Sequence, residues 1–225
     1  MLTIIACIAA AKGTWAQNNQ ELPALYMVGN LVQEEVLQVR ERPTAGSYVV
    51  GSFSSQDRNI EVIGVDDTGR WGLINLENGG NGWVYMPYLV SQEHSEWHSQ
   101  IRPIYCTGNN PEWRAEIGAL NSDGAMVTLT NSDVFFLPFG RIQSVWRDGG
   151  GGNGAYNALT TFAGNNGVSE AMMLLRGERC TDVKSGADYG ISVELQMVFH
   201  ANSVPWDSQY EGCCTMTYSE LGSGY

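Results

Sequence analysis

The sequence predicts an all-β protein that is stabilised by disulfides and lies outside the cytoplasm. Short segments of alternating apolar and polar residues recur along the chain, separated by turns rich in Gly, Asn and Asp. Four of the five cysteines enclose most of the second half, a usage typical of oxidising compartments. The chain also opens with a short apolar run. Its 225 residues suffice for one large domain or two small ones.

The apolar run over residues 2–11 is followed by a Thr-Trp-Ala sequence at residues 14–16, with small residues where a signal peptidase reads them. We therefore expect residues 1–16 to be a signal peptide that is cleaved before Gln17. The run is too short to span a bilayer. Because no Lys or Arg precedes it, a buried first strand is the alternative.

The first domain is predicted to consist of short strands joined by tight turns. Strand-like alternation begins near Tyr26. Residues 66–69 (Asp-Asp-Thr-Gly) and 79–82 (Gly-Gly-Asn-Gly) are predicted turns, because Asp and Gly tolerate positive φ. The strand candidates that follow Tyr26 are residues 36–40, 49–53, 60–65, 71–74, 83–86 and 88–90.

This stretch resembles a bacterial SH3-like domain over about residues 25–90. The family runs from a Leu-x-Val-Arg strand through a Pro-containing loop to a Gly-Trp-Val segment and a Tyr-Leu pair. The resemblance implies an SH3-like barrel, and such domains often accompany peptidoglycan hydrolases. The chain departs from the family at Glu41 and Arg42, in the loop that often borders the ligand groove. The matching residues are Leu37, Val39, Arg40, Pro43, Val50, Gly51, Phe53, Val62, Gly64, Trp71, Gly82, Trp83, Val84, Tyr88 and Leu89.

Four aromatic residues of this domain, Tyr48, Trp71, Tyr85 and Tyr88, are candidate walls of a groove for a glycan or peptide. Aromatic rings offer flat apolar faces to such ligands and keep a polar edge. The alternative is that these rings fill the barrel core, and for Trp83 we expect the core.

Residues 91–103 are polar and charged, and we interpret them as a linker. His94 and His98 stand four residues apart, a spacing that on a helix would direct both imidazoles toward one metal. The segment has no helical apolar face, so we predict a solvated linker and no metal site.

The second domain, residues 104–219, again shows several short strands with Gly, Asn and Asp turns, which predicts a β-barrel or sandwich. The glycine-rich residues 148–154 lack the lysine of a phosphate-binding loop, and we interpret them as a turn. The strand candidates are residues 104–106, 113–117, 125–129, 134–137, 142–146, 172–176, 192–199 and 211–218.

This half resembles an uncharacterised domain of bacterial envelope proteins. That domain opens with Cys-x-Gly-x-Glu-Pro-Phe-Trp, has a Cys-Ser-Asp-x-Met-Ser-Asp-x-x-Tyr motif and ends with Gly-Cys-Cys. The resemblance implies an envelope location and a lipocalin-like or META-like β fold, and it implies no reaction. Asn110, Glu112, Lys184 and Gly186 depart from the motifs. The matching residues are Cys106, Gly108, Pro111, Trp113, Cys180, Asp182, Ser185, Tyr189, Gly212, Cys213 and Cys214.

If Cys7 leaves with the signal peptide, the even set Cys106, Cys180, Cys213 and Cys214 remains. Four cysteines allow three connectivities. Pairing the neighbours Cys213 and Cys214 would form a strained ring, so either of the two other connectivities is expected. A zinc site is the weaker alternative, because adjacent cysteines lack the two-residue gap of metal ligands.

The net charge of −12, from 12 basic and 24 acidic residues, argues against nucleic acid or an anionic membrane face as a partner. We expect no catalysis and no cofactor. The histidines are few, Cys180 lacks the helix start of a thiol nucleophile, and nothing brings Glu112 and Asp182 together as a glycosidase pair. The loop with Asp182, Ser185 and Tyr189 is interpreted as structural rather than as a ligand site.

These patterns predict a non-catalytic, secreted or periplasmic envelope protein whose SH3-like module binds cell-wall peptidoglycan, through peptide or glycan. The alternative is an envelope inhibitor or sensor that binds a protein partner. Because the chain is acidic, a basic lysozyme-type enzyme would suit it.

Overall fold

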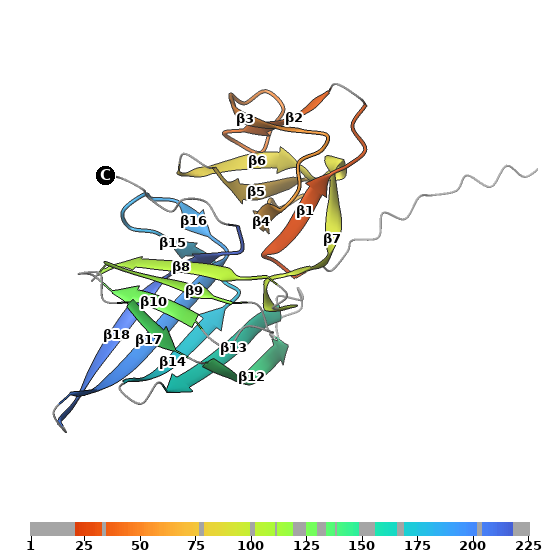
Figure 1. Ribbon diagram of the computed structural model, residues 1–225. Coiled ribbons are helices and arrows are strands. Elements are labelled where there is room, and N and C mark those ends of the chain that lie inside the picture. Colours follow the sequence, from red (N-terminus) through yellow and green to blue (C-terminus); the bar gives the residue numbers. More distant parts are fainter. Residues whose placement is uncertain are drawn as a thin grey trace, which may run out of the picture.

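A computed structural model of the chain describes residues 21–32, 35–76, 79–99, 102–110, 112–118, 125–129, 134–137, 139–148, 156–165, 169–201 and 204–217. The protein is all-β, as predicted, and its strands form a seven-stranded sheet, a nine-stranded sheet and a two-stranded hairpin (Figure 1). We refer to the first two as the N-terminal and C-terminal sheets. The expected signal peptide, residues 1–16, and residues 149–154 of the glycine-rich turn lie outside the described residues.

The N-terminal sheet has the order β3-β2-β6-β5-β4-β1-β7, and all its neighbouring strands are antiparallel. Connections between successive strands explain three of these pairings, β2 with β3, β4 with β5 and β5 with β6, whereas the other three join strands that are not successive in sequence. Gly69, for example, has φ +67° in the turn between β4 and β5, as residue 69 of the predicted turn requires. The bounds are β1 (Ala24–Val28), β2 (Val36–Arg40), β3 (Val49–Ser54), β4 (Ile60–Val65), β5 (Trp71–Asn75), β6 (Asn81–Tyr85) and β7 (Leu89–Glu96), with one 3₁₀ turn at η1 (Met86–Tyr88) and another at η2 (Trp97–Ser99).

Strand β1 is buried on both faces, which explains its apolar sequence Ala-Leu-Tyr-Met-Val. Ala24, Tyr26 and Val28 belong to the core of the N-terminal sheet. Leu25 points the other way and belongs to the core of the C-terminal sheet. One strand therefore contributes side chains to both cores.

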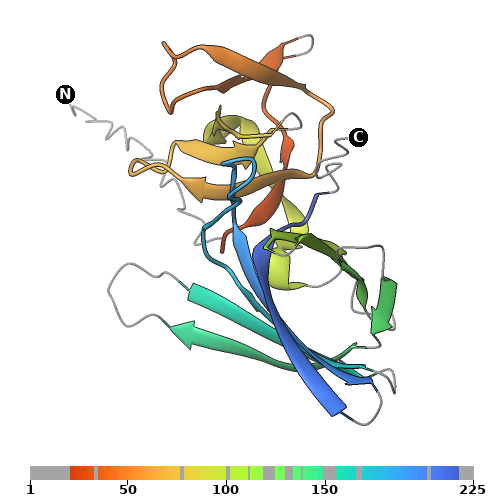
Figure 2. The same cartoon turned by 90° about the vertical axis from the view of Figure 1, so that its left-hand side faces the viewer.

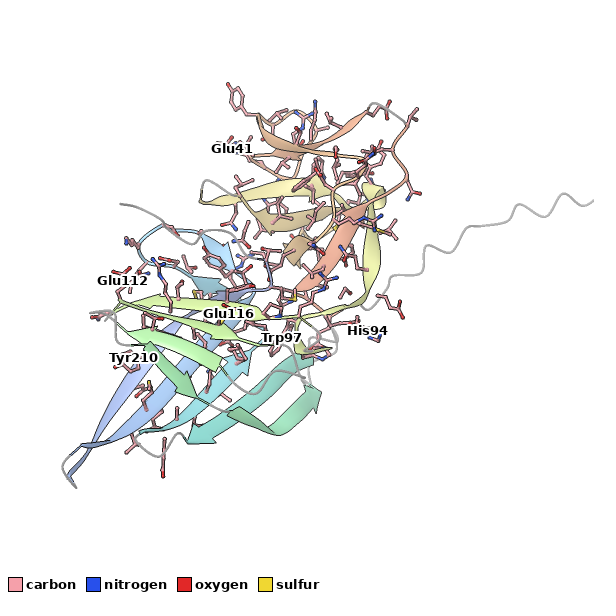
Figure 3. All side chains as sticks on the ribbon, in the orientation of Figure 1. Glu41, His94, Trp97, Glu112, Glu116 and Tyr210 are labelled. Carbon is pink, nitrogen blue, oxygen red and sulfur yellow. A yellow bond between two sulfur atoms is a disulfide. The ribbon has the colours of Figure 1, made fainter. Side chains whose placement is uncertain are left out.

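The segment predicted as a linker is more ordered than its polar composition suggested. Residues 91–96 belong to β7, which pairs with β1. Trp97 is buried where the two sheets meet, within the C-terminal core (Figure 3). The sequence prediction missed this because backbone pairing to β1, rather than apolar side chains, holds most of the segment.

The C-terminal sheet has the order β11-β10-β9-β8-β18-β17-β14-β13-β12 and is antiparallel throughout. It curls into a half-barrel, which brings β11 toward β14 (Figure 2). Strands β15 and β16 form the separate hairpin. The bounds are β8 (Ile104–Asn109), β9 (Glu112–Ile117), β10 (Ala125–Leu129), β11 (Val134–Leu137), β12 (Phe139–Asp148), β13 (Tyr156–Asn165), β14 (Ser169–Arg176), β15 (Cys180–Thr181), β16 (Asp188–Tyr189), β17 (Ile191–Ala201) and β18 (Val204–Thr215).

Alternate residues of β8, β9, β14 and β17 fill the concave side of the C-terminal sheet. On β9 the pattern is strict, because Trp113, Ala115 and Ile117 are buried and the residues between them are exposed. The same alternation on β17 buries Ile191, Val193, Leu195 and Met197. These side chains form the larger of the two cores.

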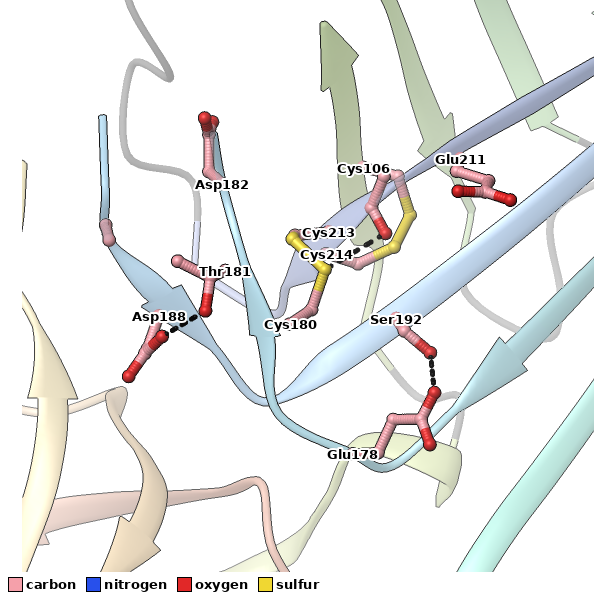
Figure 4. Close-up of a disulfide and its surroundings, with 12 residues drawn as sticks. Cys106, Glu178, Cys180, Thr181, Asp182, Asp188, Ser192, Glu211, Cys213 and Cys214 are labelled. Atoms are coloured by element: carbon pink, nitrogen blue, oxygen red, sulfur yellow. Dashed lines mark hydrogen bonds between the residues drawn. A yellow bond between two sulfur atoms is a disulfide. The ribbon is translucent and has the colours of Figure 1, made fainter. Parts of the chain in front are cut away.

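The structure selects one of the two disulfide connectivities left open by the sequence. Cys106 is bonded to Cys214, and Cys180 is bonded to Cys213 (Figure 4). Because successive side chains of a strand point to opposite faces, Cys214 lies in the large core while Cys213 joins Cys180 in a small cluster outside it. The first disulfide links β18 to β8, and the second ties the β15–β16 hairpin to β18.

Candidate functional site

The β15–β16 hairpin docks on the N-terminal sheet through two asparagines. Asn81 Nδ2 donates to the Asp188 carbonyl at 2.8 Å, and Asn81 Oδ1 accepts from the Asp188 N–H at 2.7 Å. Asn75 Nδ2 donates to the same carbonyl at 2.6 Å. We call the face that carries Asn75 and Asn81 the outer face. The hairpin covers one end of it.

The other end of the outer face carries three aromatic residues in contact. Trp71 and Tyr85 are direct partners across β5 and β6, and their ring centroids are 5.3 Å apart at an angle of 62°. Tyr88, on η1, continues the series, with its centroid 5.8 Å from that of Tyr85 at 61°. We call Trp71, Tyr85 and Tyr88 the aromatic row. All three rings are partly accessible, and Tyr88 is 38% exposed.

The predicted turn before β5 positions Trp71. Asp66 Oδ1 accepts from the backbone N–H groups of Arg70 and Trp71, each at 2.9 Å. Its Oδ2 accepts from the Thr68 hydroxyl at 2.7 Å. Slight burial opposes ionisation, but these hydrogen bonds outweigh it and lower the pKa of Asp66. The ionised carboxylate thus holds the start of β5 in place.

Tyr48 does not share the ring contacts of the other three candidates within the described residues. It precedes the edge strand β3, and its side chain is 82% exposed. Its carbonyl accepts from the Glu41 N–H at 2.9 Å. The structure therefore gathers Trp71, Tyr85 and Tyr88 into one cluster, and a ligand-binding role for these residues and for Tyr48 stays a prediction.

Trp83 is not in the core, so the prediction made for it from the sequence is wrong. It alternates along β6 with Gly82 and Val84, which are buried, so it faces the outer side and is only partly covered. Gly82 is glycine because a Cβ there would lie 2.4 Å from Val39 Cγ1. A small residue at the crowded inward position therefore leaves the large ring outside. Arg40, its direct partner on β2, lies on the same face.

A buried carboxylate lies where the outer face meets the C-terminal sheet. Glu61, on β4, is 4% exposed and is the cross-strand partner of Leu25. Its Oε2 accepts from the Thr215 hydroxyl and from the Met216 N–H, the latter at 3.2 Å. Burial raises the pKa of Glu61 to about 7, although these hydrogen bonds partly oppose the shift. Glu61 was not among the residues predicted from the sequence, where its only signal is an acidic position between apolar neighbours.

The loop between β15 and β16 is held by its own hydrogen bonds. Asp182 Oδ1 accepts from Lys184 N at 2.6 Å, from Ser185 N at 3.1 Å and from Asn109 Nδ2 at 2.9 Å. The Ser185 hydroxyl accepts from Ala187 N at 3.2 Å. These contacts favour the structural interpretation of the loop, because its polar side chains already serve the turn.

No cluster of three or more His, Cys, Asp or Glu side chains suited to a metal occurs in the described part of the chain. His98 Nε2 lies 3.0 Å from Glu21 Oε2, and His94 extends toward Glu93 on the surface. Within the same residues, no helix is long and apolar enough to cross a membrane. The two disulfides indicate a compartment other than the cytoplasm.

Comparison with known proteins adds no assignment. No protein-family model, no curated protein and no solved structure matches the chain.

Proposed function

We propose that the chain is a secreted or periplasmic envelope protein whose N-terminal sheet is an SH3-like module that binds the cell wall. The single observation that supports this function is the aromatic row. Trp71 and Tyr85 are partners on one face of the sheet, Tyr88 follows on η1, and the three rings are in contact and partly accessible. Rings in such an arrangement provide apolar area with little loss of conformational entropy on binding.

The docked hairpin supports a site with a defined end. Asn75 and Asn81 lie on the same two strands as Trp71 and Tyr85, and both bond to Asp188. A ligand that lies along β5 and β6 would therefore meet the hairpin beyond Trp83. A rigid wall of this kind favours a defined ligand register over indiscriminate adsorption.

The test is co-sedimentation of the full-length oxidised protein with purified peptidoglycan sacculi. We expect Trp71→Ala and Tyr85→Ala to weaken retention about tenfold each, as removal of a central aromatic contact does. Met172→Ala is the control, since Met172 is an exposed apolar residue on β14 of the C-terminal sheet, away from the aromatic row; it should change retention less than twofold. Near-ultraviolet circular dichroism checks that each variant is folded.

Absence of retention of the wild-type protein, at both low and moderate salt, would overturn the proposed function. In that case the search would move to protein partners in the envelope. If Trp71→Ala and Tyr85→Ala are both retained as well as the wild type, wall binding stands but the aromatic row is not its site.

A further inference from the structure

Arg40 is an uncommon feature of this acidic surface. The chain has 12 Lys and Arg against 24 Asp and Glu. Arg40 is the direct cross-strand partner of Trp83, and both point away from the buried Val39 and Val84. Tyr85 stands two residues along β6 from Trp83 and on the same face, so Arg40 and Tyr85 are diagonal neighbours across β2 and β6, a spacing that a long side chain can bridge.

The contacts of Arg40 hold the guanidinium in place without neutralising it. Nη1 donates to the Ser47 carbonyl at 2.7 Å, and Nη2 donates to Gln38 Oε1. Both acceptors are uncharged. Among the described residues no carboxylate forms an ion pair with Arg40, whereas Arg42 pairs with Glu41 and Arg179 pairs with Asp188. Two of its five N–H donors are used, so three remain for a ligand.

The tilt between the rings of the aromatic row bears on whether the ligand is a glycan or a peptide. Successive rings of the aromatic row are inclined by 62° and 61°. Flat sugar rings stack best on coplanar faces, whereas rings that meet edge to face present no common plane to a chain of sugars. The side chains of an extended peptide can each contact a differently oriented ring. The row and the adjacent cation together therefore favour a peptide that carries a negative charge.

We propose that Arg40 recognises a free carboxylate on an extended acidic wall peptide whose side chains occupy the aromatic row. This inference rests on the proposed function and names its ligand class. A guanidinium pairs with a carboxylate through two parallel N–H bonds, so the contact selects for the ionised acid over its amide. Arg40 is a specificity residue in this scheme.

The effect of amidating the sacculi on binding distinguishes carboxylate recognition by Arg40 from a purely structural role. A protein of net charge −12 repels carboxylates, so converting the carboxyl groups of sacculi to amides should strengthen binding if no cation recognises them. If Arg40 binds a carboxylate, amidation should weaken binding. If Arg40 only stabilised the β2–β3 loop through its hydrogen bond to the Ser47 carbonyl, amidation would not weaken binding.

The experiment compares retention of the wild-type protein on native sacculi and on sacculi amidated with carbodiimide and ammonia. We expect amidation to weaken wild-type retention about tenfold. Arg40→Gln should bind native sacculi about as weakly as the wild type binds amidated ones, and amidation should not weaken it further. Arg42→Gln is the matched control, because Arg42 is a neighbouring arginine paired with Glu41; it should behave as the wild type.

Competition assigns the source of the carboxylate. Wall peptides released from the glycan should displace the protein from native sacculi, and the same peptides after amidation should be about tenfold less effective. Displacement by peptide-free glycan strands alone would overturn the peptide assignment.

If amidation strengthens wild-type retention or leaves it unchanged, the role of Arg40 is overturned, while the proposed function stands. Absence of all wild-type retention would overturn both. The comparison of wild-type retention on native and amidated sacculi tests the carboxylate contact even if Arg40→Gln fails to fold.

Discussion

The indole of Trp113 lies directly over Gly108, its cross-strand partner on β8. A Cβ on Gly108 would lie 2.1 Å from Trp113 Nε1 and 2.1 Å from the Glu211 carbonyl oxygen. The same indole N–H donates to that carbonyl at 3.0 Å. On the next strand, a Cβ on Gly212 would lie 2.1 Å from the Thr107 carbonyl oxygen. The Gly, Trp and Gly-Cys-Cys elements of the second sequence resemblance are thus one packing unit across β9, β8 and β18.

Gly108→Ala should destabilise the fold by roughly 2–4 kcal/mol, because the added methyl group meets the Glu211 carbonyl oxygen and the buried indole of Trp113. Chemical denaturation of the oxidised protein measures the loss. Gly46→Ala is the control, since nothing lies within 4 Å of a Cβ there. Equal stability of the two variants would contradict the close contact.

Glu61→Gln should abolish a pH dependence of stability. Burial raises the folded pKa to about 7 from an ordinary value of 4.5, so the folded protein retains this proton to higher pH. The stabilisation is complete below pH 4.5 and is lost as pH rises toward 7. The loss is about 3 kcal/mol, since each tenfold change in proton affinity is worth about 1.4 kcal/mol.

Free energies of unfolding of the wild type and of Glu61→Gln, measured at pH 5 and pH 8, test this prediction. The variant should be the more stable protein at pH 8, and the difference should shrink at pH 5. Parallel pH profiles would show that Glu61 does not titrate in this range. Glu35→Gln, at an exposed position, should leave the profile unchanged.

The disulfide between Cys180 and Cys213 should be reduced first. Cys180 is partly exposed, whereas Cys106 and Cys214 are both buried in the large core. Limited treatment with a dithiol, followed by alkylation and mass spectrometry, should label Cys180 and Cys213 before the other pair. Replacing both by Ser should cost about 3–4 kcal/mol in the chain-entropy model, given their separation of 33 residues. Earlier labelling of Cys106 would contradict the burial order.

Asn81→Ala should loosen the docked hairpin, because Asp188 then loses one partner for its N–H and one for its carbonyl. A loss of about 1–3 kcal/mol is expected when such groups are left unpaired. Faster amide hydrogen exchange over residues 186–190 would report the loosening. Gln56→Ala, at an exposed position beside β3, should leave this exchange unchanged.

Most strands could be predicted from the sequence, because alternation and turn residues are local signals. Residues 36–40, 125–129 and 134–137 are strands with the predicted bounds. Strand β13 was missed because Tyr156–Asn165 is rich in small and polar residues and lacks a clear apolar face. Its pairing with β12 and β14, long strands on either side, decides its conformation.

The candidate site was less predictable, because it depends on which faces the strands present. Trp71 and Tyr85 are 14 positions apart, and only the register of β5 with β6 makes them partners. Trp83 was misplaced because an aromatic residue in a strand suits either face, and Gly82 decided which one it took. Nothing in the sequence marks Asn75 and Asn81 as partners of Asp188, because Asp188 lies over 100 residues away along the chain.

Because Cys213 and Cys214 point to opposite faces of the sheet, the disulfide pairing depends on how β18 is aligned with β8. A slip of β18 by one residue against β8 would exchange the two side chains between the faces of the sheet. Cys213 would then meet Cys106, and Cys214 would meet Cys180. During oxidative folding, the two linkage isomers therefore correspond to two alignments of the same strand. Once the two bonds of the misaligned isomer have closed, thiol–disulfide exchange rather than hydrogen-bond rearrangement is the barrier to correcting the alignment.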